Sequence, residues 1–126
     1  MKIIILISIT ILALFAYSCT PESEAEKGLR IDLDVAEFKT KMSEPNTVLL
    51  DVRTPSETKN GTIDGALEIN VMSTDFKNKI QDLDKNKTYL VYCRSGRRSV
   101  KACKEMEKVG FEKLVNLKGG YKAWKK

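Results

Sequence analysis

The chain has 126 residues, which is enough for one compact domain with a single core and too few for two domains. It contains no histidine, so Ser-His-Asp and Cys-His catalytic groups and most zinc sites are excluded. The formal net charge is +5, and the lysines are dispersed among acidic residues without forming a basic stripe. This distribution does not indicate nucleic-acid binding.

The first 18 residues resemble a bacterial signal peptide. Lys2 supplies a positive charge, and residues 3–16 form an apolar run of 14 residues broken only by Ser8 and Thr10. A membrane-spanning helix needs about 20 residues. Cys19 follows the small residue Ser18, as at a bacterial lipoprotein processing site, where the cysteine is acylated and becomes the first residue. Ordinary cleavage after Ser18, which leaves a free secreted protein, is the alternative.

Residues 19–28 are polar and rich in glutamate, as expected of a tether between a lipid and a folded domain over residues 29–126. We therefore expect an exported bacterial protein, a periplasm-facing or cell-envelope lipoprotein whose only membrane contact is its lipid. Removal of residues 1–18 lowers the formal net charge to +4, because they contain one lysine and no acid. The domain is expected to be monomeric.

From Leu29 onward, strand-like and helix-like segments alternate, which is typical of an α/β fold. The expected strands are residues 29–31, 47–52, 66–71, 89–92 and 114–117, and the expected helices are residues 35–42, 57–60, 75–83, 99–109 and 121–126. Five strands interleaved with helices predict a mainly parallel five-stranded sheet with helices on both faces. Such a sheet places its site at the C-terminal ends of the strands.

Cys93 stands where the strand over residues 89–92 ends and a helix is about to begin. A tight loop at a helix N-terminus directs unpaired backbone N–H groups inward, and the helix dipole adds roughly half a positive charge. Arg94, Arg97 and Arg98 add full charges. The Cys93 thiol should therefore lose its proton well below its free pKa of about 8.5 and act as a nucleophile.

Cys103 is the next cysteine along the chain and falls on the following helix. Ten residues at 1.5 Å of rise separate it from Cys93 by about 15 Å, too far for a disulfide without unwinding the helix. We expect a small buried residue, and a thiol that resolves Cys93 chemistry is the alternative.

Several motifs together make the chain similar to a single-domain rhodanese, a thiosulfate sulfurtransferase-like family. They are Asp51-Val52-Arg53 with Glu57, Gly61-Thr62-Ile63-Asp64-Gly65-Ala66, Tyr92-Cys93-Arg94-Ser95-Gly96-Arg97-Arg98-Ser99, Gly110-Phe111, and Asn116-Leu117-Lys118-Gly119-Gly120 with Ala123-Trp124. Thr62 and Asp64 depart from the pattern, because the family usually has histidine and proline there.

The resemblance implies a two-step sulfur transfer. Cys93 attacks the outer sulfur of a donor such as thiosulfate, becomes a persulfide and passes the sulfur to cyanide or a thiol acceptor. The residues expected to bind the anionic donor are Arg94, Ser95, Gly96, Arg97, Arg98 and Ser99. Asp51, Arg53 and Glu57 are expected to support the loop through structural ion pairs. No cofactor and no metal is implied.

Two alternatives remain at this point. Phosphatases and arsenate reductases place an arginine six positions after the cysteine, where this chain has Ser99; Arg98 comes one residue early, so the loop suits a sulfur atom better than a bound tetrahedral oxyanion. A persulfide carrier or a non-catalytic rhodanese-like binding module is the second alternative.

Overall fold

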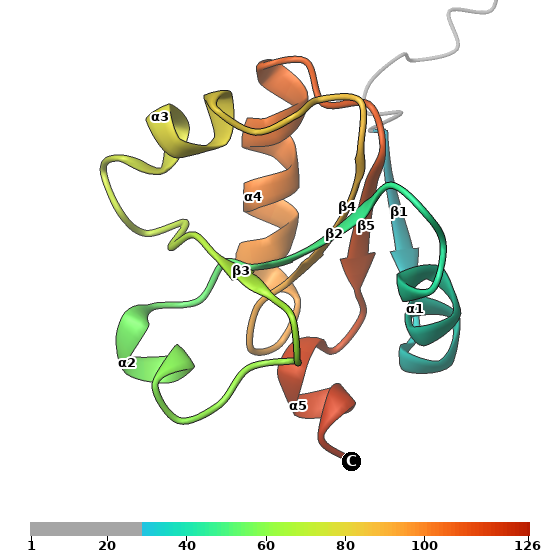
Figure 1. Cartoon of the computed structure of the whole chain (residues 1–126). Helices are drawn as coiled ribbons and strands as arrows, with labels where there is room; N and C mark the ends of the chain where they lie inside the picture. The colour runs from blue at the N-terminus through green and yellow to red at the C-terminus, as the bar shows by residue number, and fades with distance from the viewer. Residues whose placement is uncertain (1–28) are drawn as a thin grey trace, which may run out of the picture.

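Five short strands lie parallel in one sheet with the order β1-β5-β4-β2-β3. They are β1 (Arg30–Leu33), β2 (Thr47–Asp51), β3 (Leu67–Glu68), β4 (Thr88–Tyr92) and β5 (Leu114–Leu117). The computed structural model describes residues 29–126 (Figure 1). The predicted signal peptide, the tether and the predicted lipidation site Cys19 lie outside the described residues.

The helices are α1 (Val35–Met42), α2 (Pro55–Thr58), α3 (Phe76–Gln81), α4 (Arg97–Lys108) and α5 (Gly120–Trp124). α1 begins after Asp34, whose carboxylate accepts a hydrogen bond from the Glu37 N–H at 2.9 Å. The longest helix of residues 29–126, α4, has 12 residues, and no helix in this part of the chain is long and apolar enough to cross a membrane.

Two of the differences from the expected elements have local causes. α4 begins at Arg97 and not at Ser99, because Gly96 adopts a left-handed conformation (φ 103°) and completes the turn earlier. β3 has two residues in place of the expected six. Its partner β2 ends at Asp51, which pairs with Glu68. Beyond this pair the contact continues only as single hydrogen bonds, from the Ile69 N–H to the Asp51 carbonyl at 2.9 Å and from the Val71 N–H to the Val52 carbonyl at 3.1 Å.

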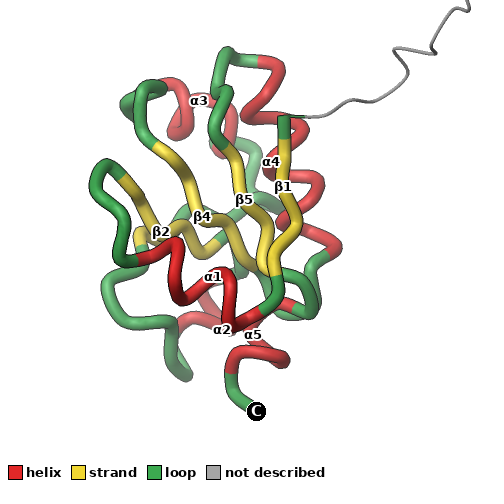
Figure 2. Tube along the Cα trace, turned by 90° about the vertical axis from the view of Figure 1, so that its right-hand side faces the viewer, coloured by secondary structure: helices red, strands yellow, loops and turns green. Residues whose placement is uncertain are grey.

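Side chains that alternate along the central strands fill two cores on opposite faces of the sheet. Figure 2 shows α1 on one side of the sheet and α4 on the other. Tyr89 and Val91 pack towards α3 and α4, whereas Leu90 and Tyr92 pack towards α1 and α5. The predicted α/β fold with a parallel sheet and helices on both faces is confirmed. Trp124 covers the second core and packs edge-on against Phe38, with ring centroids 6.4 Å apart.

The last helix is attached directly to the backbone that carries Cys93. The Tyr121 N–H donates to the Cys93 carbonyl at 2.8 Å, and the Lys122 N–H donates to the Arg94 carbonyl at 3.0 Å. Gly120 permits this approach: it has φ 58°, and a Cβ there would lie 2.6 Å from the backbone of Arg94.

Gly120→Ala should therefore weaken both stability and the geometry of the Cys93 loop. Gly65→Ala is a matched control, since Gly65 also has a positive φ of 84° but nothing lies within 4 Å of its Cβ position. We expect a loss of roughly 1–2 kcal/mol for Gly65→Ala from backbone strain alone. Gly120→Ala should lose about 1–3 kcal/mol more because of the overlap. Urea unfolding measures both, and equal losses would contradict the close approach.

Candidate active site

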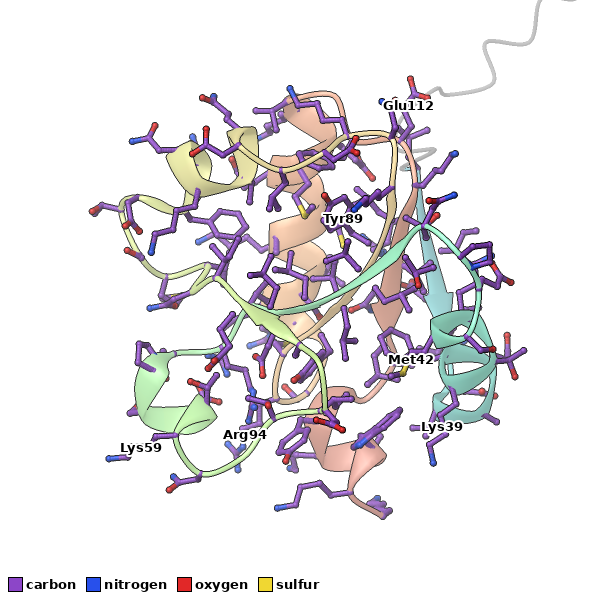
Figure 3. The ribbon with its side chains drawn as sticks, in the orientation of Figure 1. Lys39, Met42, Lys59, Tyr89, Arg94 and Glu112 are labelled. Carbon is purple, nitrogen blue, oxygen red and sulfur yellow. The ribbon has the colours of Figure 1, made fainter. Side chains whose placement is uncertain are left out.

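Cys93 directly follows β4, the central strand of the sheet, at the edge where the C-terminal ends of the strands meet. Its side chain is 1% exposed. The Gly96 N–H donates to Cys93 Sγ at 3.1 Å, so the chain turns back over the sulfur before α4 begins. In Figure 3 the neighbouring Arg94 lies at this end of the molecule, between α2 and α5. The predicted strand–loop–helix arrangement is therefore present.

Ser99, in the first turn of α4, contacts the sulfur with its hydroxyl group. Its Oγ lies 3.4 Å from Cys93 Sγ, 3.0 Å from the Gly96 carbonyl oxygen and 2.5 Å from Asn116 Oδ1. A serine hydroxyl has a single proton, so these three acceptors compete for it. Asn116 therefore affects how strongly Ser99 can donate to an anionic sulfur.

Asn116 and Asp32 extend this contact away from the nucleophile. The Asn116 side-chain amide donates to Asp32 Oδ1 at 3.0 Å, which leaves its carbonyl oxygen facing Ser99. Asp32 in turn pairs with Arg30 at 2.8 Å. Neither Asn116 nor Asp32 was a predicted site residue. One sequence feature could have pointed to Asn116: it is a polar residue within the otherwise apolar run Leu114–Leu117. This strand pairs with β4, which leads directly into Cys93.

The pKa of Cys93 is lowered. Burial alone would raise this pKa, but hydrogen bonds from the Ser99 hydroxyl and from the backbone N–H groups of Ser99, Ser95 and Gly96 outweigh the burial. The expected lowering is therefore present. The guanidinium groups that the sequence suggested are not among its main causes. Backbone and hydroxyl donors have the principal effect.

The three arginines of the loop region have different surroundings. Arg98 forms a two-pronged ion pair with Glu57, with N–O distances of 2.6 and 2.8 Å. This pair lowers the pKa of Glu57 to about 2. Arg94 and Arg97 are exposed, and neither forms an ion pair with a described residue. Arg98 therefore joins α4 to α2, while Arg94 and Arg97 are the exposed members of the three arginines expected to bind the donor.

The second predicted supporting pair, Asp51 with Arg53, is almost fully buried. Their side chains meet at 2.7 Å, with 0% and 4% exposure. Arg53 also donates to the Gly61 carbonyl at 2.8 Å and lies 4.2 Å from the ring centroid of Tyr121. It therefore links the segment after β2 to α5. Thr62 is partly buried and Asp64 is exposed, while Ile63 between them donates its N–H to the Tyr92 hydroxyl at 2.9 Å.

The chain matches a family of known proteins. Residues 34–126 match the family described as the rhodanese-like domain. The chain belongs to this family. The resemblance to rhodaneses noted in the sequence is thereby confirmed.

Two relatives and one solved structure illustrate the similarity. The chain is 38% identical over 94 residues to the putative sulfurtransferase YtwF of Bacillus subtilis, covering 74% of this chain and 88% of that protein. It is 32% identical over 94 residues to a sulfurtransferase of Allochromatium vinosum, covering 74% and 86%. A crystal structure of a rhodanese-like domain protein from Staphylococcus aureus matches with a TM-score of 0.66 and 31% identity, covering 74% and 89%.

Cys103 of this rhodanese-like domain has a different environment from Cys93. Cys103 lies on α4, is 0% exposed and faces the core between this helix and the sheet. Both cysteines are free thiols. Burial raises the pKa of Cys103 to about 12. The expected small buried residue is confirmed. Among residues 29–126 no group of three or more histidine, cysteine, aspartate or glutamate side chains is placed to hold a metal ion.

Competition for the Ser99 proton predicts opposite shifts of the Cys93 pKa in two variants of this rhodanese-like domain. Ser99→Ala removes a donor to the sulfur and should raise the pKa. Asn116→Leu removes a competing acceptor and should lower it. The pH dependence of the iodoacetamide reaction rate, with the labelled cysteine identified by peptide mass spectrometry, measures both. Shifts in the same direction, or an unchanged pKa in Asn116→Leu, would contradict the competition. Cys103 should remain unlabelled near neutral pH.

Proposed function

We propose that this rhodanese-like domain is a sulfurtransferase that moves a sulfane sulfur from an anionic donor such as thiosulfate to cyanide or a thiol. The observation that carries the proposal is the lowered pKa of a buried cysteine held among N–H and O–H donors. A thiolate is the nucleophile that such a transfer needs. The sulfurtransferase relatives support the same reaction class.

In the first step the Cys93 thiolate attacks the outer sulfur of thiosulfate. A sulfur–sulfur bond forms to Cys93, the bond between the two donor sulfurs breaks, and sulfite leaves with the electron pair. Arg94 and Arg97 are exposed cations near the start of α4 and would attract the dianionic donor. The N–H groups that point at Sγ would then face the terminal sulfur of the persulfide anion.

In the second step cyanide or a thiolate attacks the terminal sulfur of the persulfide. The product leaves as thiocyanate or as a new persulfide, and the bonding electrons return to the Cys93 thiolate. No external oxidant or reductant is required, because the sulfane sulfur is only transferred. The absence of histidine fits this sequence of steps, since the attacking thiolate forms without a general base.

Persulfide formation gives a direct test. After incubation of the purified protein with thiosulfate, intact mass spectrometry should show the gain of one sulfur atom on Cys93, and Cys93→Ser should show none. Thiocyanate should then form on addition of cyanide, whereas an aryl phosphate should not be hydrolysed. A protein without a sulfur adduct would be a binding module. A protein that loads once but does not turn over would be a persulfide carrier.

We also propose that the chain is exported and anchored by a lipid on Cys19. The support is the residue pattern of the first 19 positions: a charged start, an apolar run and a cysteine after a small residue. Expressed in a bacterium, the full chain should sediment with membranes and yield an acylated N-terminal peptide. Cys19→Ser should be found in the soluble fraction or remain unprocessed. An unmodified Cys19 in wild-type protein would contradict the anchor.

A further inference from the structure

A cleft of about 350 Å³ opens beside the Cys93 loop, between α2 and α5. Arg94, the residue after the nucleophile, lines it, and Figure 3 shows Arg94 between these two helices. The residues that matter for its chemistry are Arg53, Glu57, Arg94, Tyr121, Lys122 and Lys125. The cleft therefore adjoins the loop that carries Cys93.

Charge in the cleft is unbalanced. Arg53 is neutralised by the buried carboxylate of Asp51, and Glu57 is neutralised by Arg98. Arg94, Lys122 and Lys125 have no carboxylate partner among the described residues. The only acidic side chain that lines the cleft is thus already paired, and three cations remain to attract an anion.

Tyr121 gives the cleft a fixed wall. Its N–H donates to the Cys93 carbonyl, and its ring centroid lies 4.2 Å from the Arg53 guanidinium and 5.4 Å from the Lys125 ammonium. The backbone of Lys122 is bonded to the Arg94 carbonyl at 3.0 Å. Lys122 and Lys125 are therefore carried on a helix whose position relative to the nucleophile is set by backbone hydrogen bonds.

The size of the cleft indicates a ligand larger than the sulfur donor. Binding pockets for organic molecules start at roughly 300 Å³. Thiosulfate and cyanide have only a few atoms and leave most of such a volume empty. In a molecule that reacts at Cys93 and also fills the cleft, the far end lies beside Lys122 and Lys125. An anionic group at that end, several bonds from the reacting atom, would complement these cations.

We propose that the cleft binds the acidic tail of the sulfur acceptor, a low-molecular-weight thiol that carries carboxylate or phosphate groups. This inference rests on the proposed function and names the acceptor class for it. The acceptor thiolate attacks the terminal sulfur of the Cys93 persulfide, leaves as a persulfide and returns the electron pair to Cys93. Lys122 and Lys125 bind the tail, and the ring of Tyr121 lies along the carbon chain.

The test separates transfer from loading. The full-length protein is loaded with thiosulfate, freed of excess donor, checked for the added sulfur by mass and mixed with pairs of thiols that differ mainly in charge. 6-Mercaptohexanoate and 6-mercaptohexanol form the carboxylate pair; 4′-phosphopantetheine and pantetheine form the phosphate pair. Rates are corrected for the thiolate fraction of each thiol. The acidic member of at least one pair should react roughly tenfold faster with wild-type protein.

Lys122→Gln/Lys125→Gln should reduce this ratio to roughly two or less, because only Arg94 remains of the three unpaired cations. Lys85→Gln/Lys113→Gln removes the same charge from segments that precede β4 and β5, at the opposite edge of the sheet, and should keep the wild-type ratio. A ratio that survives in the α5 variant, or falls equally in the control variant, overturns the proposal. The pair that shows the effect identifies carboxylate or phosphate as the preferred group.

Binding without sulfur chemistry gives an independent measurement. Titration calorimetry with succinate and with O-phosphoethanolamine, neither of which has a thiol, should show at least one of them binding wild-type and Lys85→Gln/Lys113→Gln protein more tightly than Lys122→Gln/Lys125→Gln. Equal affinities overturn the anion site. If no sulfur adduct forms on Cys93, the proposed function fails and the acceptor role fails with it, while the calorimetry still decides whether the cleft binds anions.

Discussion

The site depends on hydrogen-bond donors that face the sulfur of Cys93 without help from an imidazole. Burial works against an anion at this position, and the N–H groups of residues 95, 96 and 99 with the Ser99 hydroxyl reverse its effect. These donors converge because Gly96 turns the chain in the left-handed region directly before α4. A residue with a side chain would be strained in this conformation. The lowered pKa of the nucleophile is therefore a consequence of backbone geometry.

Long-range contacts hold this short loop in place. On one side the Arg98–Glu57 pair joins the first turn of α4 to α2. On the other side the N-terminus of α5 binds the carbonyls of Cys93 and Arg94, which is the approach that Gly120 allows. The same contacts bring Lys122 and Lys125 into the cleft beside the Cys93 loop. The position of α5 therefore both stabilises the Cys93 loop and forms one side of the cleft.

Residue order alone was enough to single out Cys93 as the candidate nucleophile and to predict backbone N–H donors around its sulfur. A β-forming run, a cysteine, a glycine three positions later and an amphipathic helix are local features, and the lack of histidine removed the usual activating base. The alternation of strands and helices predicted the parallel sheet for the same reason. Periodicity and turn residues act over a few positions, so they can be recognised without a structure. The ends of the elements were predicted less accurately. β3, for example, ends at the residue that pairs with the last residue of β2, and this pairing is not visible in the sequence.

Pairing between distant residues was decided only by the tertiary structure. Three arginines near Cys93 looked equivalent in the sequence, yet Glu57, 41 positions away, neutralises Arg98 and leaves Arg94 and Arg97 exposed. Asn116 meets Ser99 because β5 pairs with β4, and Asp32 meets Asn116 because β1 pairs with β5. The chain order thus determined a cysteine with a lowered pKa just before a helix. The acceptors that compete for the Ser99 proton, and the cations that keep no carboxylate partner, were decided by strand pairing and helix packing. These bring together side chains that are far apart in the sequence.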